Sequence, residues 1–355
     1  MMTASAPLRL TKEHRLALLM HGHLLLGYGK MGLGLLRYSE SPPVAVIDRD
    51  HVGGDLKALT GIPRSVPIVS SVKEALALGA NTLVIGVATA GGILPSDFWE
   101  EIRTGLIGGM SLVNGLHAPL SQHPELTPLL HFESWVWDIR REPPNLPNGT
   151  GAARNLSAKR VLTVGTDMAV GKMTTSLEMH RSAQERGLRS KFLASGQIGI
   201  SIAGEGIPLD AVRVDFASGA VEQLVVRYGN DHDILHVEGQ GSLLHPASTA
   251  WLPLLRGSCP THLILVHRMG QRHIARTDWV AIPPLKEVIA LYEAVASVGG
   301  TTPAPRVVGI ALNGGQASLE EVERATLEIE AETGVPTSDV VRFGGAKLLN
   351  AVYPE

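Results

Sequence analysis

Residues 165–175 read Gly165-Thr166-Asp167-Met168-Ala169-Val170-Gly171-Lys172-Met173-Thr174-Thr175. An apolar, β-branched run at 160–164 precedes them, and a helix-like segment at 176–186 follows. A strand, a glycine-containing loop with a lysine, and a helix together form a phosphate-binding P-loop. Backbone N–H groups surround the anion, the helix N-terminus adds partial positive charge, and Lys172 adds a full charge. We therefore predict a phosphate site formed by Gly165, Thr166, Val170, Gly171, Lys172, Met173, Thr174 and Thr175.

This loop departs from the commonest P-loop pattern in two places. Five residues separate Gly165 from Gly171 where the usual pattern has four, and Met173 stands where a Ser or Thr normally binds Mg²⁺. Thr174 and Thr175 are the nearest hydroxyls, but each helical step turns the side chain by about 100°. The alternative is an ordinary glycine-rich turn between a strand and a helix. We take Thr174 as the candidate Mg²⁺ ligand.

Three carboxylates are candidates for chemistry beside the loop. Ligands of open parallel sheets bind beyond the carboxyl ends of the strands. Glu238 ends the apolar run at 234–237, so we predict a catalytic role and a Mg²⁺ ligand there, with Asp215 as the second metal candidate. A phosphate would repel Asp167 unless a metal, a lysine or a substrate amine lay between them. Lys172, Glu238 and Asp167 form the predicted catalytic set, although each carboxylate has a capping or turn-forming alternative.

The composition limits the classes of partner. The 355 residues suffice for about two domains. With 31 basic and 34 acidic residues the net charge is −3, which disfavours nucleic acid and anionic membranes. One cysteine excludes an intramolecular disulfide, and no apolar run reaches the roughly 18 residues of a membrane span. We expect a cytoplasmic homo-oligomer that acts on a small molecule.

Strand-like and helix-like segments alternate through both halves, which predicts βαβ units and parallel sheets. We expect an α/β protein with a Rossmann-like domain at 1–140, a linker rich in turn formers at 141–158, and a P-loop domain with a doubly wound sheet at 159–355. The strands expected in the second domain lie at 160–164, 190–194, 212–216, 234–238, 262–267, 307–312 and 339–343.

The first half carries a dinucleotide-like pattern. Residues 27–32 match G-x-G-x-x-G, and Asp48 follows at the spacing of an acid that binds a ribose. The preceding strand ends near Met20, several residues before the first glycine. We therefore favour a flexible loop over a cofactor site.

Cationic side chains near turns and strand ends are candidates for binding carboxylates or moving protons. We predict that Lys30, Arg37 and His117 bind the substrate, and His245, His267 and Arg268 share this chemistry. For each single histidine a structural role is the favoured interpretation. No His/Cys cluster has zinc spacing.

The P-loop half resembles dethiobiotin synthetase, an ATP- and Mg²⁺-dependent enzyme. The resemblance lies in Gly165-Thr166-Asp167-x-x-Val170-Gly171-Lys172 and in Val237-Glu238-Gly239-x-Gly241. Met173 departs from that pattern, which has Thr. This resemblance implies a ligase or kinase that uses ATP and Mg²⁺.

Over nearly its whole length the chain is similar to the DgcN family, which pairs a Rossmann-like domain with a P-loop domain. The carrying motifs lie at 30–38, 46–48, 86–92, 114–117, 165–175, 195–200, 236–242 and 309–313. The similarity implies N-acetylation of D-glutamate or a related acidic amino acid, with acetyl-CoA as donor.

These resemblances leave alternatives open. The P-loop would hold either the diphosphate of CoA or an ATP that activates a carboxylate. An acyltransferase is our leading hypothesis, and an ATP-dependent ligase or kinase is the alternative. A non-enzymatic, nucleotide-gated regulator is a third possibility, whereas a dehydrogenase is disfavoured.

Overall fold

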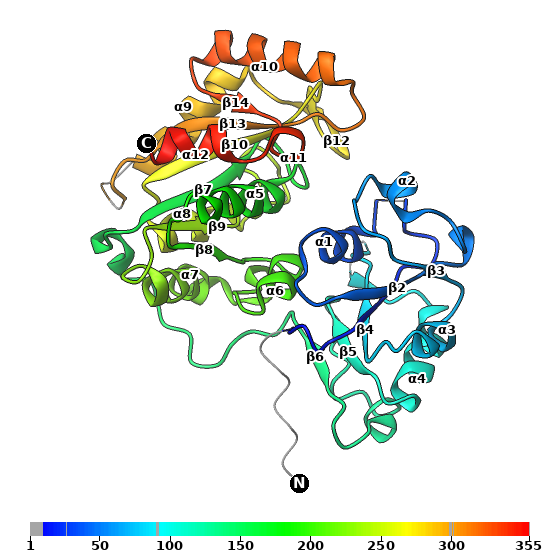
Figure 1. Ribbon diagram of the computed structural model, residues 1–355. Helices are drawn as coiled ribbons and strands as arrows, with labels where there is room; N and C mark the ends of the chain where they lie inside the picture. Colours follow the sequence, from blue (N-terminus) through cyan, green and yellow to red (C-terminus); the bar gives the residue numbers. More distant parts are fainter. Residues whose placement is uncertain (1–9, 26, 90–91, 298–299, 301, 355) are drawn as a thin grey trace. The chain divides into compact units, whose positions relative to one another are not determined.

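The computed structural model describes residues 10–25, 27–89, 92–297, 300 and 302–354 (Figure 1). The chain forms two compact units. The first contains Met1–Glu142 and Gln197–Ala211, and the second contains Pro143–Gly196 and Val212–Glu355. The division falls inside the predicted linker, but the excursion of 197–211 into the first unit is not visible in the sequence pattern. Among the described residues, no helix has the length and hydrophobicity needed to cross a bilayer.

A parallel six-stranded sheet organises the first unit, in the order β3-β2-β1-β4-β5-β6. This is the strand order of a dinucleotide-binding fold, and the strands are buried because helices cover a parallel sheet. The strands are β1 (Leu16–Leu19), β2 (Pro43–Ile47), β3 (Ile68–Val69), β4 (Thr82–Ile85), β5 (Ser111–Asn114) and β6 (Val136–Asp138). The helices are α1 (Lys30–Tyr38), α2 (Leu56–Thr60), α3 (Val72–Ala77), α4 (Phe98–Ile107) and α6 (Gln197–Ala203).

A second parallel six-stranded sheet organises the other unit, in the order β14-β13-β10-β7-β9-β8. Its strands are β7 (Lys159–Gly165), β8 (Ser190–Leu193), β9 (Ile234–Val237), β10 (His262–Arg268), β13 (Arg306–Asn313) and β14 (Thr337–Ser338). Its helices are α5 (Lys172–Glu185), α7 (Val214–Tyr228), α8 (Trp251–Ser258), α9 (Leu285–Ser297), α10 (Leu319–Thr333), α11 (Val340–Phe343) and α12 (Ala346–Val352). An antiparallel hairpin, β11 (His273–Ile274) and β12 (Thr277–Ala281), follows β10.

The predicted strand at 212–216 is wrong, because α7 begins at Val214. The alternating apolar residues of that stretch match a strand pattern only over a few positions. From Ala217 onward the buried positions, which include Ala220, Val221 and Leu224, follow a helical period of three to four residues. Helical packing therefore decides the conformation of the whole segment.

The predicted strand at 339–343 is also wrong, since these residues form α11 after the short strand β14. Asp339 is the N-cap, and its Oδ1 accepts hydrogen bonds from the amides of Val341 at 3.0 Å and Arg342 at 3.3 Å. A side chain that satisfies the first helical N–H groups favours a helix at this point. From sequence alone, an apolar run that follows an Asp is therefore compatible with either a strand or a capped helix.

A buried histidine, His236, and a half-buried one, His180, lie close together beside β9. His236 on β9 is 1% exposed, and neither of its ring nitrogens has a hydrogen-bond partner among the described residues. Its ring centroid lies 6.0 Å from that of His180 on α5. Burial lowers the pKa of His236 to about 3 and that of His180 to about 4. Both side chains are therefore neutral in the folded protein at neutral pH.

We predict that acid destabilises the protein through this pair. The unfolded chain binds a proton at each histidine below about pH 6.5, whereas the folded chain does not, so the free energy of unfolding falls as the pH falls from 6.5. Between pH 7.5 and 5.0 the loss at His236 is about 2 kcal/mol. Urea unfolding of wild type and His236→Leu across this range measures it.

The variant should lose less stability in acid than wild type, while His273→Gln, a change at an exposed histidine, should behave as wild type. Equal acid slopes for wild type and His236→Leu would contradict the assignment.

Candidate functional site

The P-loop connects the buried strand β7 to α5 through a tight backbone curl. Ala169 has φ 56° and Gly171 has φ 119°, both in the left-handed region that turns successive N–H groups inward. Among the described residues, no acceptor lies on the backbone N–H groups of Ala169, Val170 and Gly171. Unsatisfied N–H groups at a helix N-terminus form an anion site. The loop therefore presents N–H groups without an acceptor in the described part of the chain where the sequence predicts an anion site, and the binding of a diphosphate there stays a prediction.

Lys172 begins α5 and is only 6% exposed. Its Nζ donates a hydrogen bond to the carbonyl oxygen of Asp167 at 2.9 Å, which folds the side chain back over the loop. Burial lowers the pKa of Lys172 to about 8, although the carboxylates of Asp167 and Glu238 raise it. The lysine is still charged at pH 7, and a bound anion would favour the charged form further.

Asp167 is 1% exposed, and its carboxylate binds protein groups on both oxygens. Oδ1 accepts from the amide of Met168 at 2.6 Å, while Oδ2 accepts from Gln271 Nε2 at 2.6 Å and from the amide of Ala275 at 2.8 Å. Gln271 and Ala275 belong to the segment around β11. Asp167 thus anchors the hairpin to the P-loop, and its contact with substrate stays a prediction.

Glu238 follows β9, which pairs with the P-loop strand β7. Its Oε2 accepts hydrogen bonds from the amides of Ser195 at 2.8 Å and Gly196 at 3.1 Å. A Cβ on Gly239 would lie 1.7 Å from the carbonyl oxygen of Thr163, so only glycine permits this close approach to β7. Glu238 and Asp167 both lie close enough to Lys172 to raise its pKa, so the three residues are neighbours, and their catalytic roles stay predictions.

The residues considered as Mg²⁺ ligands differ in their burial and in their position in the fold. Thr175 is buried and its hydroxyl donates to the carbonyl oxygen of Gly171 at 3.1 Å, whereas Thr174 is partly exposed on the first turn of α5. Asp215 lies exposed in the first turn of α7 and not at a strand end, so the reason for choosing it is removed. Within the described ranges, no group of three or more His, Cys, Asp or Glu side chains could hold a metal. Thr174 and Glu238 would need substrate and water oxygens to complete a Mg²⁺ site.

Three side chains from other strands and helices bind the carbonyl oxygens of the loop. Tyr292 on α9 donates to the carbonyl of Gly165 at 2.8 Å, and Asn313, the last residue of β13, donates to that of Val170 at 2.9 Å. Arg268, the last residue of β10, donates from Nη2 to the carbonyl of Ala169 at 3.0 Å. The sequence places Arg268 and Asn313 at strand ends, but nothing in the local pattern around Tyr292 marks it.

His267 precedes Arg268 and is 8% exposed. Its Nδ1 lies 3.0 Å from the hydroxyl of Thr166, and burial lowers its pKa to about 4. A neutral histidine bonded to the loop supports the structural interpretation for this residue. His245 Nδ1 similarly accepts the amide of Ala247 at 3.1 Å in its own turn.

The predicted substrate residues all lie in the first unit. Lys30 begins α1, whereas Arg37 lies in its last turn, two turns away and at the opposite end of the helix. His117 follows β5 and its ring contacts the guanidinium of Arg140, which also pairs with Asp210 at 2.5 Å. The structure thus does not bring Arg37 to the sheet edge where Lys30 lies. Substrate binding by these residues stays a prediction.

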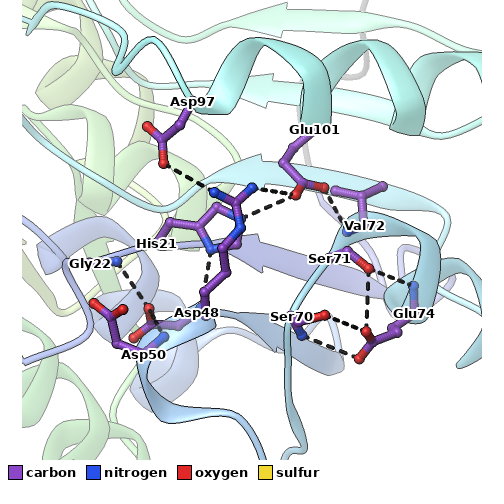
Figure 2. A network of polar contacts seen from close by, with 11 residues as sticks. His21, Gly22, Asp48, Asp50, Ser70, Ser71, Val72, Glu74, Asp97 and Glu101 are labelled. Atoms are coloured by element: carbon purple, nitrogen blue, oxygen red, sulfur yellow. Dashed lines mark hydrogen bonds and ion pairs between the residues drawn. The ribbon is translucent and has the colours of Figure 1, made fainter.

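The acid of the dinucleotide-like pattern, Asp48, belongs to a network of polar contacts within the protein (Figure 2). Asp48, at the end of β2, is fully buried; its Oδ1 accepts the amide of Gly22 at 3.0 Å and its Oδ2 contacts His51 Nδ1 at 2.7 Å. A Cβ on Gly32 would lie 2.3 Å from the Met20 sulfur, while Gly27 has open space around it. Gly32 therefore serves helix packing, and the acid that would bind a ribose is already occupied.

Glu101 on α4 also belongs to this network (Figure 2). It accepts hydrogen bonds from the amide of Val72 at 2.8 Å and from Arg49 Nη2 at 2.9 Å, and it lies 3.3 Å from His21 Nε2. Burial by itself raises the pKa of Glu101, but these hydrogen bonds outweigh it and lower the pKa to about 2. The network joins the ends of β1 and β2 to α3 and α4, which is a structural role.

Comparisons with known proteins agree with this two-unit architecture. Residues 147–349 match a family model described as a domain of unknown function, the DUF1611 C-terminal P-loop domain. Residues 49–142 match the DUF1611 N-terminal Rossmann-like domain. The chain is similar to the crystal structure of a DUF1611 family protein from Anabaena variabilis, with 57% identity, a TM-score of 0.94, and 96% of this chain and 100% of that chain covered.

Two curated relatives carry the name D-glutamate N-acetyltransferase. The protein from a Pseudoalteromonas species is 38% identical over 277 residues, which cover 77% of this chain and 82% of the relative. The protein from Tritonibacter scottomollicae is 35% identical over 306 residues, which cover 85% of this chain and 90% of the relative. The resemblance predicted from the motifs is confirmed, and the chain belongs to the DUF1611 family, with its Rossmann-like and P-loop domains.

Proposed function

We propose that this protein is an N-acetyltransferase that transfers the acetyl group of acetyl-CoA to the amine of a small acidic amino acid such as D-glutamate. The observation that carries the proposal is the P-loop, with a buried, charged Lys172 over backbone N–H groups that have no acceptor among the described residues. Such a site selects a diphosphate, and CoA carries one. The names of the two curated relatives support the same reaction.

The residues of the loop would bind and orient the donor. Lys172 and the amides of 169–171 would hold the diphosphate, and Tyr292 and Asn313 would keep the loop in shape through its carbonyl groups. Acetyl-CoA supplies a thioester carbonyl: the acceptor amine forms the new C–N bond, the C–S bond breaks, and the amine proton leaves as the CoA thiol is released. Catalysis by these residues is therefore positional, because they fix the donor's phosphates relative to the acceptor.

An ATP- and Mg²⁺-dependent ligase or kinase is the competing function. The observation that favours it is Glu238, an acid at the end of the strand beside the P-loop strand. A metal at Glu238 would compete with the amides of Ser195 and Gly196 for its carboxylate.

Thiol release tests the proposal against this alternative. The purified protein, supplied with acetyl-CoA and a panel of D- and L-amino acids, should release free thiol without ATP, fastest with an acidic amino acid. Absence of thiol release with every acceptor, together with Mg²⁺-dependent ADP formation from ATP, would contradict the proposal and support the ligase or kinase.

Removing the charge of Lys172 should weaken donor binding. We expect Lys172→Met to raise the Kd for CoA roughly a hundredfold, because a charge-assisted contact to phosphate is lost. Asp167 and Glu238 keep their N–H donors, so the melting temperature should change little. Calorimetric titration measures the Kd, and Lys286→Met, at an exposed lysine on α9, is the matched control. Unchanged affinity in Lys172→Met would place the donor elsewhere.

The lowered pKa of Lys172 predicts a pH dependence. Below about pH 8 the lysine is charged before the donor binds; above pH 8 binding must take up a proton, so the affinity for CoA falls by up to about tenfold per pH unit. Titration at pH 7, 8 and 9 in buffers of different ionisation enthalpy measures this proton uptake. The uptake should disappear in Lys172→Arg, since arginine stays charged. Proton uptake that persists in that variant would point to another group.

A further inference from the structure

The hairpin that follows β10 touches the P-loop through its turn. The strand pairing of β11 and β12 leaves Ala275 and Arg276 as the turn residues. The amide of Ala275 donates to Asp167 Oδ2, and Gln271 Nε2 donates to the same oxygen. Because Asp167 is buried inside the loop, these bonds fix the turn at the edge of the phosphate site.

Arg276 occupies this turn in an unusual backbone conformation. Its φ is 64°, in the left-handed region that favours glycine, and its side chain is exposed. An arginine there carries backbone strain that a glycine would avoid. Because Arg276 directly follows Ala275, whose amide donates to the loop residue Asp167, its backbone adjoins the P-loop.

Arg268 reaches the P-loop from the end of β10. It is exposed, and its Nη2 donates to the carbonyl oxygen of Ala169. A guanidinium has five N–H donors, so this one bond orients the group and leaves further donors for a ligand. Arg268 therefore contacts the P-loop directly, and Arg276 lies in the turn that is bonded to it, so the loop has two cationic residues nearby besides Lys172.

The charge of this segment is not neutralised by the protein. Residues 268–281 contain three arginines and one acid, Asp278, in a chain whose net charge is −3. Over the part of the chain that the structure describes, no carboxylate pairs with Arg268, Arg272 or Arg276. A local excess of positive charge beside an anion site favours a ligand that carries more than one anionic group.

Besides the diphosphate, the proposed reaction has two kinds of anionic group: the 3′-phosphate of the donor and the carboxylates of the acceptor. In CoA the 3′-phosphate and the 5′-diphosphate are carried by the same ribose, so cations next to the diphosphate site are close to the 3′-phosphate. The acceptor amine must instead meet the thioester, which the whole pantetheine arm separates from the diphosphate. The position of the arginines therefore favours the 3′-phosphate.

We propose that Arg276 and Arg268 form a second anion site beside the P-loop that binds the 3′-phosphate of CoA. This inference rests on the proposed function, because it takes the P-loop ligand to be CoA. It gives the hairpin a defined role: the hairpin distinguishes CoA from nucleotides that lack a 3′-phosphate.

Calorimetric titration with CoA and with dephospho-CoA tests the inference. Wild type should bind CoA roughly ten- to a hundredfold more tightly, since a charge-assisted contact is lost with the phosphate. In Arg276→Gly this ratio should fall by about tenfold, with unchanged affinity for dephospho-CoA. Glycine suits the left-handed conformation, so the melting temperature should not fall. Arg324→Ala, which removes an exposed arginine of α10, should keep the wild-type ratio.

Three outcomes would overturn the inference. Equal affinity of the wild type for CoA and dephospho-CoA would overturn it. The proposed function would still stand in that case if the protein releases thiol from acetyl-CoA. An unchanged ratio in Arg276→Gly would exclude that arginine. Binding of ATP with Mg²⁺ but of neither CoA probe would overturn the inference and the proposed function together.

Discussion

A positive charge held almost out of water at the start of α5 is the constraint on which the site depends. Burial of Lys172 is unfavourable for its ammonium group, as its lowered pKa shows. Two carboxylates, Asp167 and Glu238, offset this cost in part, and each of them is in turn held by backbone N–H groups. The lysine, the acids and the amides therefore form one electrostatic unit.

The contacts of these charged residues connect the P-loop to segments of the second half of the structure that are distant in sequence. Asp167 binds the hairpin after β10, and Glu238 binds the amides that precede α6. Tyr292 and Asn313 engage the carbonyl groups of the loop from α9 and β13. Consequently the loop is preorganised by contacts far apart in sequence, which reduces the cost of arranging its N–H groups around an anion.

Much of this arrangement follows from local sequence. The glycines and lysine of 165–175, between an apolar strand and a helix, predict the P-loop, and Glu238 is predicted by its place after a buried strand. The alternation of strands and helices predicts both parallel sheets. Segments with competing patterns were less predictable: 212–216 alternates as a strand does, but helical packing from Ala217 onward decides it. Asp339 turns an apolar run into a helix through a capping bond that no periodicity reveals.

Contacts between distant segments determine the features that local sequence did not predict. The turn at Ala275 and Arg276 lacks the glycine or asparagine that normally marks a hairpin, so the local sequence does not predict this hairpin or its bond to Asp167. The G-x-G-x-x-G pattern at 27–32 shows the converse case. Its spacing suggests a dinucleotide, yet Asp48 is buried and bonded to Gly22 and His51. Two of its glycines, Gly29 and Gly32, instead lie against Met20.

A crystal structure of the protein with CoA would show directly whether the P-loop holds the diphosphate of the acetyl donor. We expect the diphosphate within hydrogen-bond distance of Lys172 Nζ and of the amides of 169–171. CoA bound elsewhere, with no phosphate at Lys172, would contradict it.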